Sequence, residues 1–308
     1  MKVLDAIDKG LLETIAGLHE IPRGAYNIRK NGSGISRNTT ANIDIIQKKD
    51  KPGIDIIVRP NTKGESVHIP VIVSAEGIED VVYNTFEIGA GADVLVVAGC
   101  GIHNPGAKKS QHDGVHDLYV RKGARLKYVE KHYGQGEGNG EKILNPRTFI
   151  EVEEGGVVEL EMVQIKGVDR AKRDTEIRLH KNARLIIVER LLTYKDQTAE
   201  SIVNVELLGE ESTAQIISRS VAQNDSRQIF HLNMIGKSRC RGHIQCDSII
   251  MHDAQVSSIP QITALHSDAQ LIHEAAIGKI ASEQITKLMS LGLTEQEAED
   301  TILQGFLK

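Results

Sequence analysis

The chain has 308 residues, which is enough for one large domain or two modest ones with an ample core. Charged residues make up 26% and the formal net charge is -5, which argues against a nucleic-acid binder and against a disordered chain. The longest apolar run, residues 94–102, is far shorter than the ~20 residues that span a bilayer. The acidic start of the chain lacks the apolar core of a signal peptide, so we expect a cytoplasmic protein that binds no membrane.

The chain begins with an expected helix over residues 4–18. Its apolar side chains recur at helical spacing: Leu4, Ile7, Leu11, Ile15 and Leu18. We therefore assign residues 1–38 to an N-terminal helical segment.

A short repeat then runs through the middle of the chain. A small or turn-forming residue, Ala, a polar residue and an aliphatic residue recur in this order, from positions 91, 123, 182, 213, 253 and 268, with a degenerate copy at 155. Most intervals are near twice the last one, so one rung is about fifteen residues long. Gly, Asn and Asp tolerate positive φ and mark a corner, and the small Ala lets successive corners stack. The pattern favours an all-β core, a parallel β-helix over residues 39–280, with an ordinary β-sandwich as the alternative.

The end of the chain is helical again. Residues 282–292 predict a helix that Gly292 closes, and a second helix follows with a capping box of Thr294 and Glu297. The pair exposes more apolar surface than a helical hairpin can bury. We therefore expect the segment 281–308 to pack on the end of the solenoid or on another protein.

Several motifs resemble binding sites but are not interpreted as sites. The glycine-rich stretch 134–140 is not followed by a helix, so it predicts a mobile loop and not a nucleotide site. His112 and His116 lie in a turn-rich segment and are interpreted as exposed loop histidines. Cys100 and His103 are two potential metal ligands, and two are not a site.

One constellation remains, made of Cys246, His273 and Glu274. Thiolate, imidazole and carboxylate together suit iron or zinc. In a regular strand His273 and Glu274 point to opposite faces, so both reach one metal only at a bulge or where the strand meets a partner chain. A core thiol beside a structural histidine stays the open alternative.

Residues 246–307, from "CDSIIM" through "SSIPQITALHSDAQLIHEAAIGKI" to "LTEQEAEDTILQGFL", resemble the C-terminal signature of the SufB/SufD family. The glutamate after the histidine in "HEA" makes the chain more similar to SufB than to SufD. The upstream repeats are compatible with the body of that family, so the resemblance spans most of the chain.

The resemblance implies a right-handed parallel β-helix with helical ends, which serves as a scaffold for assembling a transient [4Fe-4S] or [2Fe-2S] cluster. It implies that Cys246, His273 and Glu274 bind the nascent cluster at a homodimer or heterodimer interface. It also implies that the C-terminal helices dock a SufC-type ABC ATPase, and that a sulfur donor and apo-protein acceptors are further partners. From the apolar positions of the tail we nominate Ile285, Leu288, Leu303 and Phe306 as docking residues.

Two features depart from the family pattern. The chain is shorter than many SufB proteins, and no cysteine lies between Cys100 and Cys240, where longer relatives have one thought to receive sulfur. The alternative function is a metal-dependent sugar- or acyl-modifying β-solenoid enzyme that uses His112, His116 and His132 around a groove. The absence of Trp and the scarcity of Tyr argue against such an enzyme, since these usually line a sugar groove with aromatic platforms.

Overall fold

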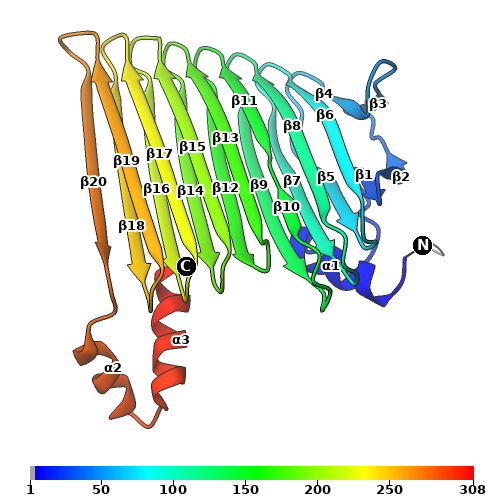
Figure 1. Cartoon of the computed structure of the whole chain (residues 1–308). Coiled ribbons are helices and arrows are strands. Elements are labelled where there is room, and N and C mark those ends of the chain that lie inside the picture. The colour runs from blue at the N-terminus through cyan, green and yellow to red at the C-terminus, as the bar shows by residue number, and fades with distance from the viewer. Residues whose placement is uncertain (1–3) are drawn as a thin grey trace.

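The computed structural model describes residues 4–308, the side chain of residue 166 excepted. In this part of the chain two long sheets of mainly parallel strands face each other and form a parallel β-solenoid of about eight turns, with helices at its ends (Figure 1). The expected parallel β-helix is confirmed, and the β-sandwich alternative is wrong. The fold is set by alternating side chains, since one face of most strands, such as β15 and β17, is buried in the space between the sheets.

Sheet A runs in spatial order β2 (Ser33–Asn38), β1 (Ala25–Lys30), β5 (Lys63–Val73), β7 (Asp93–His103), β9 (Arg125–Gln135), β12 (Val157–Lys166), β14 (Arg184–Thr193), β16 (Thr213–Ala222), β18 (Arg241–Ile250) and β20 (Gln270–Gly278). Sheet B runs β19 (Gln255–Ala264), β17 (Arg227–Gly236), β15 (Thr198–Leu207), β13 (Arg170–Leu179), β10 (Lys142–Leu144) with β11 (Arg147–Val152), β8 (Ser110–Val120), β6 (Glu79–Ile88), β4 (Gly53–Val58) and β3 (Ile43–Gln47). From β12 to β20 the chain alternates between the two sheets, so parallel neighbours there are two strands apart in sequence.

The expected rung length is half of the real turn. From β13 to β20 successive strands begin 14 or 15 residues apart, which matches the predicted interval of fifteen. However, Arg170 pairs with Thr198, and Thr198 pairs with Arg227, so a strand meets its own sheet again only after two intervals. One turn of the solenoid therefore holds two strands, one in each sheet.

The repeat marks the corners, as its residue types predict. Gly91, Gly123, Gly155 and Asn182 have φ of 66°, 65°, 71° and 58°. The N–H of each corner residue donates to a carbonyl of the next turn, at 2.9–3.0 Å. The small residue that follows is buried at Ala92, Ala124 and Ala183, and Cys240 takes the equivalent place at a later corner. Burial of a small side chain under a corner is a structural role, so it accounts for Cys240.

Helix α1 (Ala6–Ala16) covers the outer face of sheet A at the start of the solenoid. Leu11 and Ile15 are fully buried, and a Cβ added to Gly99 of β7 would lie 2.7 Å from the Ile15 carbonyl oxygen. The helix therefore needs glycine beneath it. In the assigned helical segment 1–38, only α1 is helical among the described residues, because β1 and β2 follow it; residues 1–3 of that segment lie outside the described residues.

The two ends of the solenoid differ. At the N-terminal end the outermost strands, β2 and β3, are antiparallel to their neighbours β1 and β4. At the C-terminal end β19 and β20 each pair on one side only within the described chain. Ile262, Leu265 and Ile277 there are 43%, 65% and 44% exposed. Free strand edges with apolar side chains are the surface that recruits another chain.

The C-terminal helices hang from the end of β20 (Figure 1). α2 (Ser282–Met289) leads to α3 (Glu295–Phe306), and the expected capping box of Thr294 and Glu297 is present. Leu303 and Leu307 are buried against Val221 on the outer face of sheet A, so the solenoid covers part of the tail. No helix of residues 4–308 is long and apolar enough to cross a membrane.

The glycine-rich stretch is stacked on the preceding turn. The N–H of Gly138 donates to the Asn104 carbonyl at 3.2 Å, and that of Gly140 to the Gly106 carbonyl at 2.9 Å. A Cβ at Gly138 or Gly140 would lie within 2.3 Å of a backbone oxygen. The glycines thus permit close approach of two backbones, which is the physical reason for the "GQGEGNG" composition.

Candidate functional site

Cys246 lies on the inner face of β18, in the next-to-last strand of sheet A. Its side chain is fully buried, and the hydroxyl of Ser258 on β19 donates to Sγ at 3.4 Å. Burial raises the pKa of this thiol, and hydrogen bonds from Ser258 and Ser218 act in the opposite direction. The thiol is therefore buried, with the hydroxyl groups of Ser258 and Ser218 beside it.

His273 and Glu274 lie on β20, the last strand of sheet A, and face opposite ways. His273 pairs in register with Ile244, which is fully buried, so its imidazole faces the interior. Glu274 pairs with Gln245, and its side chain is 65% exposed on the outer face. The β18–β20 register runs without a bulge, and β20 is an edge strand. Of the two conditions that would let both residues reach one metal, only the free edge is met.

The interior face thus brings Cys246 and His273 onto adjacent strands, two positions apart along the register. Burial lowers the pKa of His273, and its Nε2 is buried without a hydrogen-bond partner. A neutral imidazole with an unpaired nitrogen is in the state that a metal requires. Within residues 4–308, however, no group of three or more His, Cys, Asp and Glu side chains is arranged to hold a metal ion. The chain by itself offers only part of a ligand set.

Glu274 has a different neighbour, which the sequence reasoning missed. His243 on the outer face of β18 places Nε2 3.5 Å from Oε2 of Glu274. The alternation of β18 could have revealed this neighbour. If Cys246 and Ser248 point inward, then His243 and Gln245 of the same strand must point outward. The outer and inner faces of the last turn therefore hold separate histidines.

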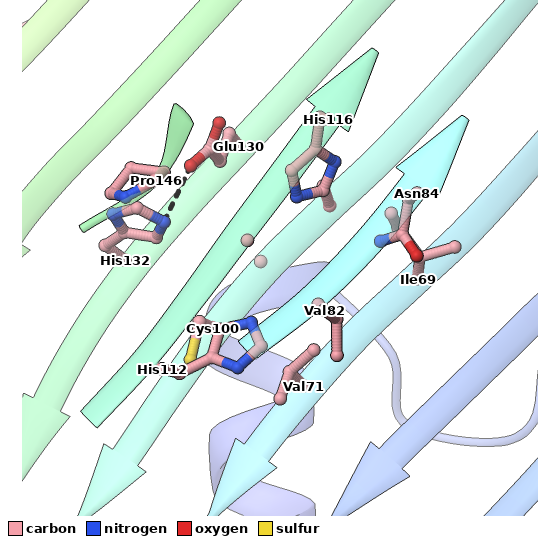
Figure 2. A pocket seen from close by; sticks show the side chains of 13 residues that line it. Ile69, Val71, Val82, Asn84, Cys100, His112, His116, Glu130, His132 and Pro146 are labelled. Carbon is pink, nitrogen blue, oxygen red and sulfur yellow. Dashed lines mark ion pairs between the residues drawn. The ribbon is translucent and has the colours of Figure 1, made fainter. Parts of the chain in front are cut away.

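A buried polar cluster fills the interior nearer the N-terminus (Figure 2). His112 and His116 belong to strand β8 and are 4% and 7% exposed, so their interpretation as exposed loop histidines is wrong. Alternation explains the error: both are inward residues of a strand whose Gly and Asp content resembles a turn. His112 Nδ1 lies 3.1 Å from Asp80, and His116 stacks on Phe86 with ring centroids 5.8 Å apart. Burial lowers the pKa of His116 to about 4.

A charged network continues this cluster toward Cys246. His132 Nε2 lies 2.7 Å from Glu130, and Arg173 pairs with Glu189 at 3.3 Å. Glu189 in turn accepts hydrogen bonds from Ser201 at 2.7 Å and Ser218 at 2.9 Å. Burial alone would raise the pKa of Glu130, but His132 and Arg173 hold it far below its usual range. The network keeps the buried Glu130 carboxylate ionised through neighbouring positive charge, and it surrounds Glu189 with two hydroxyl donors and a guanidinium.

The cavity beside these histidines is small. Its volume is about 30 Å³, and its lining includes Cys100, His112, His116, Glu130 and His132 (Figure 2). A site for a sugar or an acyl substrate needs some 300 Å³ or more. The histidines therefore do not line a groove of the kind that the alternative enzyme requires. Cys100 points into this cavity. His103 lies three positions further along β7, so its side chain leaves the opposite face of the strand and does not line the cavity.

Together the geometry defines a class of protein: a parallel β-solenoid whose last two strands in sheet A carry a buried thiol and an inward imidazole beside a strand edge that no other described strand covers. The comparison with protein families makes this specific. The model of the family described as "SUF system FeS cluster assembly, SufBD core domain" matches residues 72–306. The chain belongs to the SufBD family, whose role is iron–sulfur cluster assembly.

Curated relatives agree with this assignment. The chain is 30% identical over 250 residues to an iron–sulfur cluster assembly SufBD family protein of Archaeoglobus fulgidus. The aligned region covers 80% of this chain and 66% of that protein. It is 27% identical over 269 residues to one of Methanocaldococcus jannaschii, which covers 85% and 84%. A third, of Pyrococcus horikoshii, is 24% identical over 305 residues, covering 96% and 84%. The chain thus spans about two thirds of the first of these relatives and most of the other two.

Proposed function

We propose that the chain is the scaffold subunit of a cytoplasmic SUF-type assembly complex, on which a transient [4Fe-4S] or [2Fe-2S] cluster is built. The observation that supports this most is the position of Cys246 and His273. Both face the interior from the last two strands of sheet A, and no other strand of residues 4–308 pairs with the outer edge of β20. Thiolates are the usual ligands of iron–sulfur clusters, and an imidazole can replace some of them.

The proposed site is completed by a second subunit, either a copy of this chain or a paralogue. β19 and β20 leave free edges, and Ile262, Leu265 and Ile277 leave apolar surface beside them. A two-fold axis at this end would bring each ligand in twice, once from each chain. Glu274 lies on the outer face of β20, so it would reach a cluster shared by the two subunits only around the free edge of this strand.

Anaerobic reconstitution with iron and sulfide tests the scaffold. Wild-type protein is expected to develop the visible absorbance of a cluster, and Cys246→Ala to lose it. Cys100→Ala and Cys240→Ala are the matched controls, because one lines the interior cavity and the other fills a corner. Equal loss in all three variants would contradict the assignment of the site.

A SufC-type ABC ATPase is the proposed partner of the C-terminal helices, with Ile285, Leu288, Leu303 and Phe306 as its contacts. The burial of Leu303 against Val221 changes how this is tested. Replacing Leu303 would loosen α3 from the solenoid, so loss of binding would not isolate a docking contact. Ile285 and Leu288 of α2 are the cleaner positions, since no residue of α2 is buried.

The docking test therefore uses the double variant Ile285→Ala/Leu288→Ala with Gln284→Ala as control. Apolar anchors of this kind are typically worth about 2 kcal/mol each in an interface. The double variant is expected to lose co-purification with the ATPase, while the control keeps it and far-UV circular dichroism stays unchanged. Undiminished capture by the double variant would place the docking surface elsewhere.

A further inference from the structure

The outer face of sheet A carries a row of arginines that the interior site does not use. Arg125, Arg184 and Arg241 begin β9, β14 and β18, and they line a groove of about 610 Å³. We propose that this groove binds an acidic, amphipathic helix of a partner protein. The groove lies on the opposite face of the sheet from Cys246, so it is a surface distinct from the proposed cluster site.

The strand register places the three arginines in one line across the sheet. Val157 pairs with both Arg125 and Arg184, and Thr213 pairs with both Arg184 and Arg241, so successive arginines are two strands apart. Neighbouring strands lie about 4.8 Å apart, which puts successive arginines about 9.6 Å apart. The row therefore spans about 19 Å of the sheet.

The positive charge of this row is not neutralised by the described chain. All three side chains are exposed, and none forms an ion pair or a side-chain hydrogen bond with another residue of 4–308. Among the described residues that line the groove, Glu159 is the one carboxylate, and Asp93 flanks Arg125 outside the groove. The groove thus keeps an excess of positive charge in a chain whose net charge is -5, so its complementary ligand is an anion.

The floor of the groove favours a protein over a nucleic acid. Val157, Ile186 and Ile272 place aliphatic side chains between and beside the arginines, and Ile186 and Ile272 are 38% and 56% exposed. None of the described lining residues is aromatic, so the groove offers no platform on which a base could stack. An occupant with both acidic and aliphatic side chains complements the arginine row and the floor together.

The same face of sheet A already binds two helices of this chain. Ile15 of α1 lies over Gly99 of β7, and Leu303 of α3 packs against Val221 of β16. Both contacts are in the second half of their strands, whereas the groove crosses the first residues of the strands from β9 to β20. A helix rises about 1.5 Å per residue, so acidic residues seven positions apart lie about 10.5 Å apart on one face. This step is close to the arginine spacing, and the long arginine side chains can close the difference.

The groove ends at the edge of the solenoid where the cluster site is proposed. Gln270 and Ile272 of β20 belong to its lining, and His273 on the same strand faces the interior. A protein held in the groove would therefore lie beside this edge, where a protein that exchanges iron or sulfur with the site has to be. Only this role of the partner rests on the proposed function, and the binding of an acidic helix does not.

Fluorescence anisotropy of a labelled peptide tests the groove in the full-length protein. The probe is a helical peptide of three heptads, with one glutamate in each heptad and leucines on the same face. Arg184→Gln is expected to weaken binding about threefold, and the triple variant Arg125→Gln/Arg184→Gln/Arg241→Gln about thirtyfold, because each exposed ion pair contributes little. Arg227→Gln is the matched control, since Arg227 also begins a strand, is exposed and has no ion pair within residues 4–308, but lies on sheet B. Circular dichroism of each variant checks that the solenoid is intact.

Charge reversal separates the groove from a general effect of surface charge. Arg184→Glu/Arg241→Glu should lose the glutamate peptide and should bind the same peptide with lysine in place of glutamate. Unchanged binding by the triple variant, or an equal loss in Arg227→Gln, would overturn the proposal. Tighter, arginine-dependent binding of an oligothymidylate would also overturn it, because the ligand would then be a nucleic acid. Cys246→Ala should bind the peptide as wild type does, so a failure of cluster reconstitution in wild type would refute the scaffold function and leave the groove standing.

Discussion

Replacing Arg173 by methionine is expected to destabilise the solenoid by about 3–5 kcal/mol at neutral pH, because it leaves buried carboxylates without their cation. Arg173 is 6% exposed and faces the interior from β13. Its guanidinium lies 3.3 Å from Glu189 and 4.0 Å from Glu130, which are 1% and 5% exposed. Methionine keeps most of the volume, so a cavity contributes little to the expected loss.

The pH dependence has a definite sign. In wild type the pKa of Glu130 is depressed, so its contribution to stability is present above the unfolded pKa and is lost as pH falls. Without Arg173 one of the forces that depress this pKa is gone, and burial, which raises it, weighs more. The folded variant then accepts a proton on Glu130 at a higher pH than folded wild type does, although His132 still lowers this pKa. The destabilisation caused by Arg173→Met should therefore be full at neutral pH and shrink as the pH falls below the ordinary glutamate value of 4.5.

Urea unfolding followed by far-UV circular dichroism measures both effects. Arg178→Met is the control on the same strand, because Arg178 faces outward, is 48% exposed and lies 3.6 Å from Glu206. An exposed pair of this kind contributes at most about 1 kcal/mol. Equal losses in the two variants, or a loss in Arg173→Met that does not change with pH, would refute the account of the buried network.

Three further expectations concern other parts of the chain. Because burial lowers the pKa of His116 to about 4, below the unfolded value of 6.5, stability should fall by on the order of 3 kcal/mol as pH drops through this window; His116→Gln should flatten the curve of unfolding free energy against pH. Gly138→Ala should lower the urea midpoint, since the new Cβ meets backbone atoms of the preceding turn, whereas Gly123→Ala, with open space but φ of 65°, should cost about 1 kcal/mol. Ile262→Lys should shift small-angle X-ray scattering from a dimer to a monomer, and Ile46→Lys, with a similar exposure at the N-terminal end of the solenoid, should not; a wild-type monomer would contradict the dimer.

The corners were the part of the fold most accessible from the sequence. Gly91, Gly123 and Asn182 are needed for positive φ, and the small residues after them are needed for stacking, so both properties leave a direct trace in residue type. The pairing of strands leaves no such trace. A fifteen-residue interval is compatible with one strand or two per turn, and only the register of Arg170 with Thr198 decides between them.

The buried histidines were missed for a related reason. The alternation of β8 is regular, with His112, Gly114, His116 and Leu118 inward, but three of these four are not apolar. The search for strands relies on alternation of apolar and polar residues, so a strand whose inward side chains are polar is not recognised as having a buried face. The partners that satisfy it, such as Asp80 for His112, come from another turn, 32 residues away.

The last turn shows how a solenoid gives two adjacent residues different roles. In a compact active site, side chains converge from loops onto one point, and neighbours in sequence share that point. In a parallel strand without a bulge they cannot, because successive side chains leave opposite faces of the sheet. His273 therefore belongs with Cys246 inside, and Glu274 with His243 outside. Only the edge of β20 is common to both faces, so a partner chain bound at this edge would be in reach of both pairs of residues at once.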